Sequence, residues 1–150
     1  AQRFDIKGKK YIGANKKYYF EDIGIRNAIL GFRQDDIGHK IENIVYNELK
    51  LRGFSVDVGI LQKRQENKCQ YFEIDFVANF GSKTIYFQVT NSLANTNVLE
   101  RENKPFNLFN SSHTKIILTT DEILPYQQDN GVIVMNLIDF LLDKNITKIF

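Results

Sequence analysis

The segment DDIGHKIENIVYNELKLRG, residues 35–53, predicts one long helix and decides the fold expected for this chain. Its apolar residues recur at helical spacing and make a single stripe, formed by Ile37, Ile41, Ile44, Val45 and Leu49. Asp35 or Asp36 can cap the start of this helix, and Gly53 can end it. We therefore expect a helix from about Ile37 to Arg52 that turns one face towards a core.

Strands and helices follow this segment in a simple order. Three strand-like runs come first, at residues 54–61, 71–78 and 83–90. A partly helical stretch at 96–110, broken at Pro105, precedes two strands at 115–120 and 131–135, and Asn136 can cap a last helix. This order predicts an α/β fold with a mixed central sheet flanked by helices.

The residues before the long helix predict smaller elements. Arg3 to Ile12 is expected to form a hairpin that turns at Lys7-Gly8-Lys9. Residues 16–20 predict a short aromatic strand, and residues 23–30 predict a short helix ended by Gly31. We therefore expect an N-terminal extension over residues 1–35 and one domain over residues 36–150.

The composition is that of one globular domain inside a cell. The chain has 150 residues and a single cysteine, Cys69, which favours a reducing compartment. It contains neither an apolar run long enough to span a membrane nor the apolar stretch of a signal peptide. We expect a cytoplasmic protein without membrane contact.

Positive charge gathers at the N-terminal end. Residues 1–20 hold six Lys or Arg residues and one acid, Asp5, whereas the whole chain has a net charge of +2. A basic end of this kind suits a polyanion such as DNA, although a solvated tail is the simpler alternative. The candidate nucleic-acid-binding residues are Lys7, Lys9, Lys10, Lys16 and Lys17.

Polar residues in three expected elements could carry chemistry. Glu42 lies in the long helix, Asp75 in the second strand and Gln88 in the third. If both strands alternate, Asp75 and Gln88 project to one face of a hairpin. Oxygen ligands at a sheet end suit Mg²⁺, which can activate water and steady the charge of a phosphodiester. Solvated surface carboxylates are the alternative interpretation.

The same residues resemble a catalytic motif. In PD-(D/E)XK nucleases, a helix glutamate, a strand aspartate and a strand (D/E)-X-K tripeptide share a metal site. Glu42 matches the first position, Asp75 the second, and Gln88-Val89-Thr90 falls where the tripeptide belongs. The resemblance implies a restriction-endonuclease-like domain with Glu42, Asp75, Gln88 and Thr90 at its catalytic positions and Mg²⁺ or Mn²⁺ as its metal.

Nearly the whole chain resembles one narrower family, the nuclease-fold domain of unknown function at the C-terminus of prokaryotic AAA-type ATPases. The matching segments are KYYFEDIGIRNA (17–28), residues 38–47, EIDFVA (73–78), ERE (100–102) and NLIDFL (136–141). The resemblance implies an upstream ATPase module and a winged-helix segment that ends in the hairpin at 3–12. This chain has no phosphate-binding loop motif, so we expect no nucleotide site in it.

The motif departs from its pattern at two positions. Gln88 brings no charge to a metal, and Thr90 cannot supply the lysine cation. Arg101 or Lys104 on the next helix could replace that cation in space. We expect a degenerate site that binds metal weakly and cleaves poorly.

Three functions follow from these observations. The first is a DNA-binding domain with a degenerate site that serves an attached ATPase. The second is an active Mg²⁺- or Mn²⁺-dependent DNA nuclease in which Glu42, Asp75 and Gln88 hold the metal. The third is a protein-interaction module that pairs with the ATPase or forms a homo-oligomer.

Overall fold

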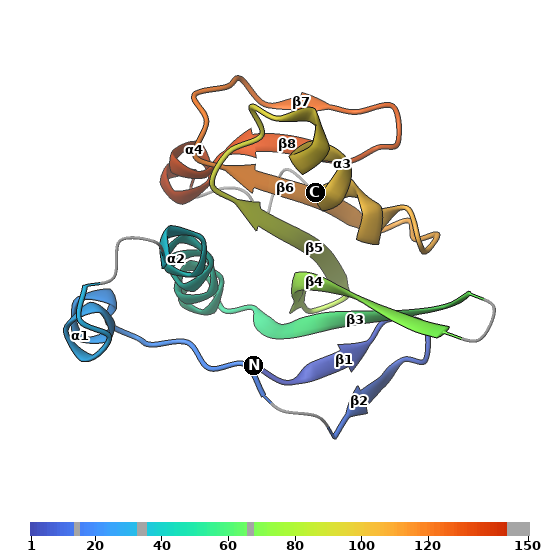
Figure 1. The fold of residues 1–150 in the computed structure, drawn as a ribbon, viewed down its shortest axis with the longest axis horizontal. Coiled ribbons are helices and arrows are strands. Elements are labelled where there is room, and N and C mark those ends of the chain that lie inside the picture. Colours follow the sequence, from blue (N-terminus) through green and yellow to red (C-terminus); the bar gives the residue numbers. More distant parts are fainter. Residues whose placement is uncertain (14–15, 33–35, 66–67, 144–150) are drawn as a thin grey trace.

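The structure is a computed structural model, and it describes residues 1–13, 16–32, 36–65 and 68–143. Its strands are β1 (Arg3–Asp5), β2 (Lys10–Ile12), β3 (Ser55–Gln65), β4 (Lys68–Phe80), β5 (Lys83–Thr90), β6 (Thr114–Thr119), β7 (Tyr126–Gln127) and β8 (Ile133–Asn136). Its helices are α1 (Ile23–Ile29), α2 (Ile37–Leu51), α3 (Thr96–Phe106) and α4 (Leu137–Leu142). Among the described residues these elements form a mixed α/β fold (Figure 1).

One mixed sheet of eight strands runs through the molecule in the order β2-β1-β3-β4-β5-β6-β8-β7 (Figure 1). β3, β4 and β5 are an antiparallel meander. The chain then crosses through α3, so that β6 pairs parallel with β5, and β8 pairs parallel with β6. The mixed sheet expected from the element order is therefore confirmed.

The N-terminal hairpin forms as expected and continues this sheet. β1 pairs antiparallel with β2 and parallel with β3. Ile6, at the turn, is buried in one of the core clusters. The hairpin is thus packed on the same sheet as the rest of the chain.

The helix α2 follows its predicted stripe at three of the five positions, and Ile44 is only half-buried. Ile41, Val45 and Leu49 are buried, but Ile37 is 49% exposed because it stands in the first turn, ahead of the sheet contact. Gly53 has a φ of 86°, the left-handed conformation that ends helices at glycine. Asp36 is the N-cap residue, yet its side chain pairs with Arg26 in place of capping the helix. Asp35 lies outside the described residues.

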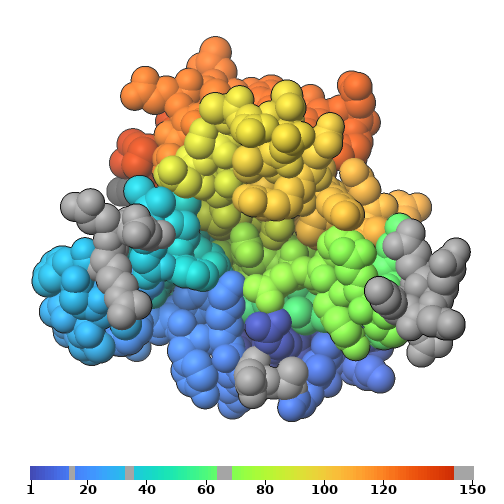
Figure 2. Space-filling model, viewed as in Figure 1, coloured from blue at the N-terminus to red at the C-terminus, as the bar shows by residue number. Residues whose placement is uncertain are grey.

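Each face of the sheet has its own core. α2 and α4 pack with Phe76 and Phe87 on one face. Phe106 of α3 packs with Val77 on the other face. In Figure 2 the yellow surface of α3 lies between the orange C-terminal strands and the green β3–β4 hairpin.

Two local predictions were wrong, and one short strand was not predicted. Residues 16–20 are not a strand, because the Phe20 backbone bonds to the Asn43 side chain of α2 and has no strand partner there. Helix α3 continues through Pro105, which stands one residue before its end and so interrupts little of it. The two-residue strand β7 was missed, since so short a run carries no periodic signal.

Candidate functional site

A β-bulge shapes the centre of the candidate site. The pairing of β3 with β4 steps from Asp57↔Val77 to Gly59↔Ile74, so one residue of β3 faces two of β4. Ile74 and Phe76 consequently belong to cores on opposite faces of the sheet. Asp75 lies between them in the bulge, where strict alternation fails.

Asp75 and Gln88 lie together where β4 and β5 begin to separate. The backbone ladder between these strands starts at Phe76↔Phe87. Beyond it, the Asp75 N–H donates to Gln88 Oε1 at 2.7 Å, and the Val89 N–H donates to Asp75 Oδ2 at 2.8 Å. The two side chains thus replace the missing backbone bonds.

Glu42 reaches the site from α2 and is already occupied. Tyr19 donates its hydroxyl to Glu42 Oε1 at 2.5 Å, and Lys17 Nζ lies 2.6 Å from the same oxygen. Lys17 also pairs with Glu73 at 2.9 Å, and Arg3 pairs with Glu73 at 2.6 Å. Two buried or half-buried carboxylates therefore share one ammonium group.

The electrostatics keep that ammonium charged. Burial by itself would lower the pKa of Lys17, but the hydrogen bonds and charges of Glu42 and Glu73 outweigh it and raise the pKa above its usual value. For Glu73, burial alone would raise the pKa of the carboxyl group. The hydrogen bonds and charges of Lys17 and Arg3 outweigh burial and lower that pKa below its usual value.

Asp75 behaves in the opposite way. Burial of its carboxyl group and the nearby charge of Glu42 raise its pKa to about 8, against the pull of the Val89 N–H and of Lys17. Glu102 adds to the increase. Part of the Asp75 residue still touches solvent, but the carboxyl group is surrounded by protein. Asp75 is therefore mostly protonated near pH 7.

Glu102 is a site residue that the sequence analysis missed as a functional group. It is buried on α3 and accepts a hydrogen bond from Gln88 Nε2 at 3.2 Å. Arg101 pairs with it at 2.8 Å. Its position three residues after Leu99 and four before Phe106, both packed in one core, was the available signal.

Thr90 and the proposed replacement cations have different surroundings. Thr90 is buried at the end of β5 beside Thr119 of β6 and brings no charge. Arg101 reaches the edge of the site through Glu102, whereas Lys104 Nζ lies over the Phe72 ring, 5.2 Å from its centroid. Lys17, which the sequence analysis assigned to nucleic acid, is the cation that lies among the carboxylates.

The described residues contain no group of three or more His, Cys, Asp or Glu side chains arranged to hold a metal ion. Glu42 and Asp75 are the carboxylates that could contribute ligands. Lys17 and Tyr19 engage Oε1 of Glu42, so a metal would compete with them at that atom, and Asp75 would have to lose its proton.

The remaining candidate lysines are open to solvent. Lys7, Lys9 and Lys10 are exposed in the β1–β2 hairpin, and Lys16 is exposed beside Lys17. These four can reach a polyanion, while Lys17 is half-buried in ion pairs.

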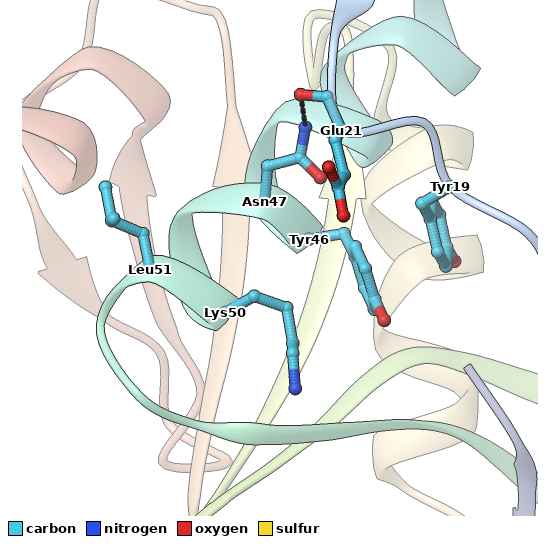
Figure 3. Close-up of a pocket in the computed structure, with 6 residues that line it drawn as sticks. All are labelled: Tyr19, Glu21, Tyr46, Asn47, Lys50 and Leu51. Carbon is cyan, nitrogen blue, oxygen red and sulfur yellow. Dashed lines mark hydrogen bonds between the residues drawn. The ribbon is translucent and has the colours of Figure 1, made fainter.

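A hollow of about 590 Å³ lies next to the site, between the N-terminal segment and α2 (Figure 3). Tyr19 and Tyr46 stack there with ring centroids 4.2 Å apart. Asn47 holds the segment by donating to the Glu21 carbonyl at 3.0 Å (Figure 3). The stack orients the Tyr19 hydroxyl that donates to Glu42.

The fold and the site define a mixed α/β domain whose polar centre includes Glu42 of α2 and Glu102 of α3. The chain is 34% identical over 142 residues to an uncharacterized protein of Haemophilus influenzae. The match covers 95% of this chain and 32% of that protein, so the two are homologous over nearly the whole chain, which spans about a third of the relative's length. No family model matches the chain, and no solved structure matches it.

Within the described residues, none of the helices has both the length and the apolar character needed to cross a membrane.

Proposed function

We propose that this chain is a nucleic-acid-binding domain with a restriction-endonuclease-like framework and a degenerate PD-(D/E)XK site, joined in its parent protein to an AAA-type ATPase. The order of α2, the β3–β5 meander, α3 and β6 supports the framework, together with the resemblance of Glu42 and Asp75 to its motif. The proposal is of a domain that binds DNA and cleaves it poorly or not at all.

The observation that carries the proposal is that protein groups already engage the motif residues. Glu42 holds Lys17 and Tyr19, and Gln88 Oε1 accepts from the Asp75 backbone. Mg²⁺ demands ionised or carbonyl oxygens in near-octahedral geometry and gives up its own water reluctantly. A site whose acids are paired with an ammonium group or protonated is a poor competitor for that ion.

The binding face of the proposal is the basic hairpin. Lys7, Lys9 and Lys10 stand exposed on one turn, where they can neutralise phosphates. Because such contacts release counterions, binding should weaken steeply with salt. The ATPase partner rests on the family resemblance and fits the relative of about three times the length of the matched region. The exposed free thiol of Cys69 is consistent with a cytoplasmic location.

A second candidate function is a Mg²⁺- or Mn²⁺-dependent DNA nuclease. The observation that favours it is the raised pKa of Asp75 beside Glu42 and Glu102. A strongly shifted pKa next to other charged groups is typical of functional sites. In this alternative Glu42, Asp75 and Gln88 would hold the metal once Asp75 had lost its proton to solvent, and Lys17 would supply the ammonium group that Thr90 lacks.

The test combines binding and cleavage on the same DNA substrates. Fluorescence anisotropy with duplex and branched DNA in EDTA should give binding that weakens with salt. Supercoiled DNA with Mg²⁺ or Mn²⁺ should stay intact with the wild type and with Asp75→Asn alike. Metal-dependent cleavage that Asp75→Asn removes would replace the first function with the second. Absence of DNA binding at low salt would reject the proposal that this domain binds DNA.

A further inference from the structure

Two neighbouring hollows lie apart from the Asp75 site, between the β1–β2 turn and the loop after α3. The outer one has a volume of about 640 Å³ and the inner one about 240 Å³. They are neighbours, because Ile6, Lys9, Tyr86 and His113 line both of them. The turn and the loop lie on the same side of the molecule, at the right of Figure 1.

The outer hollow has the chemistry of a phosphate site. Its polar lining consists of hydrogen-bond donors from two directions, Lys7 and Lys9 on one wall and Asn110, Ser111, Ser112 and His113 on the other. No acidic side chain lines it. Ammonium, hydroxyl and amide groups that converge in this way suit the anionic oxygens of a phosphodiester.

The inner recess has the chemistry of a base site. Phe4, Tyr11 and Tyr86 line it together with the buried Asp57 carboxylate, and Tyr11 is 59% exposed. The Tyr11 ring is held in place by an edge contact with Phe4, at 5.5 Å between centroids, and by its hydroxyl, which donates to Asp57 Oδ2 at 3.1 Å. A ring fixed and exposed in this way offers a flat surface for stacking.

We infer that this groove binds one nucleotide of an unpaired strand, with its phosphate in the outer hollow and its base against Tyr11 in the inner recess. A base inside a duplex is stacked and paired, so it cannot enter such a recess without leaving the helix. The inference deepens the proposed function, on which it rests, by naming the form of nucleic acid and the surface that reads it. None of Glu42, Asp75, Gln88 and Glu102 lines the groove.

Fluorescence anisotropy with the full chain tests the groove, using a short labelled single strand and a hairpin duplex of the same sequence. The single strand should bind more tightly than the duplex. Tyr11→Ala should weaken single-strand binding by about fivefold to a hundredfold, the usual range for one lost stacking partner. Lys9→Gln should weaken it as well, whereas Lys63→Gln, the same charge change on exposed β3 surface, should have little effect.

The variant Tyr11→Phe tests whether the aromatic ring itself is needed for single-strand binding. It keeps the ring and its edge contact with Phe4 and removes the hydroxyl that donates to Asp57, so it should bind the single strand more tightly than Tyr11→Ala does. Equal affinity of Tyr11→Ala, Lys9→Gln and wild type would overturn the groove while leaving the DNA-binding proposal intact. Stronger binding of the duplex would also overturn it. Failure of the wild type to bind any nucleic acid would instead reject the proposed function itself.

Discussion

Lys17 Nζ lies 2.6 Å from Glu42 Oε1, so an ammonium group from the N-terminal segment rests on the carboxylate of the first core helix. The same ammonium lies 2.9 Å from Glu73 of β4. The segment therefore joins a helix to a strand through charge, beside the residues of the proposed site.

Loss of this cation should destabilise the domain. Lys17→Met leaves Glu42 and Glu73 in a partly dry environment without their shared partner, which should lower the free energy of unfolding by about 2 kcal/mol. Urea denaturation at pH 7 measures the change. Lys16→Met, at the exposed neighbouring position, is the matched control and should alter stability little. Equal effects of both substitutions would contradict the structural role of Lys17.

Asp75 should make stability fall as pH rises. Its pKa is about 8 in the folded chain against an ordinary value of 3.8, so the folded state binds the extra proton between these values. Stability from this group is complete below about pH 4 and is lost as pH rises through 8. Asp75→Asn mimics the protonated form and can still accept from the Val89 N–H.

The difference between the two proteins isolates this effect. Between pH 5 and pH 8, the urea midpoint of the wild type should fall further than that of Asp75→Asn. At pH 8 the variant should be the more stable protein. Parallel pH profiles would mean that Asp75 is ionised in the folded chain.

Divalent metal ions should change the thermal stability of the wild type little. Because Glu42 is paired and Asp75 is protonated, millimolar Mg²⁺ should leave the thermal unfolding temperature unchanged at pH 7. Differential scanning calorimetry with Ca²⁺ as a second ion and Asp75→Asn as the control protein checks this. A rise in the wild type that the variant lacks would identify a working metal site.

Binding of DNA should lose salt sensitivity when hairpin charges are removed. Each lysine that contacts a phosphate contributes about 0.9 to the slope of log K against log salt. The double substitution Lys7→Gln with Lys10→Gln should therefore reduce that slope by up to about 2. Lys63→Gln is the control for charge alone, and a slope unchanged by the double substitution would remove the hairpin from the DNA interface.

The sequence predicted the elements that carry strong local signals. Three of the five stripe residues of α2 are buried, and a glycine ends that helix as predicted. The Asn136 cap of α4 also formed, since Asn136 accepts from the Ile138 and Asp139 N–H groups. The mixed sheet followed from the order of these elements. Local spacing alone was enough for each of these features.

The site depended on contacts between distant segments and was predicted only in part. Asp75 and Gln88 do lie together, but a bulge sets the direction of Asp75. Gly59, a glycine inside β3 at that bulge, was the available signal for it. The segment at 16–20 reads as a strand by composition, yet Asn43 satisfies the Phe20 backbone from a helix. Lys17 lies among the acids because residues 16–20 pack against α2 in this way. Periodicity within one sequence does not predict such a contact between distant segments.

The ion-pair cluster of Lys17, Glu42 and Glu73 also has an evolutionary consequence. Lys17 pairs with carboxylates from two other parts of the chain, and Arg3 also pairs with one of them, so a neutral replacement of Lys17 removes a reason to keep both glutamates charged. Among diverging homologues, positions 17, 42 and 73 should therefore change as a group.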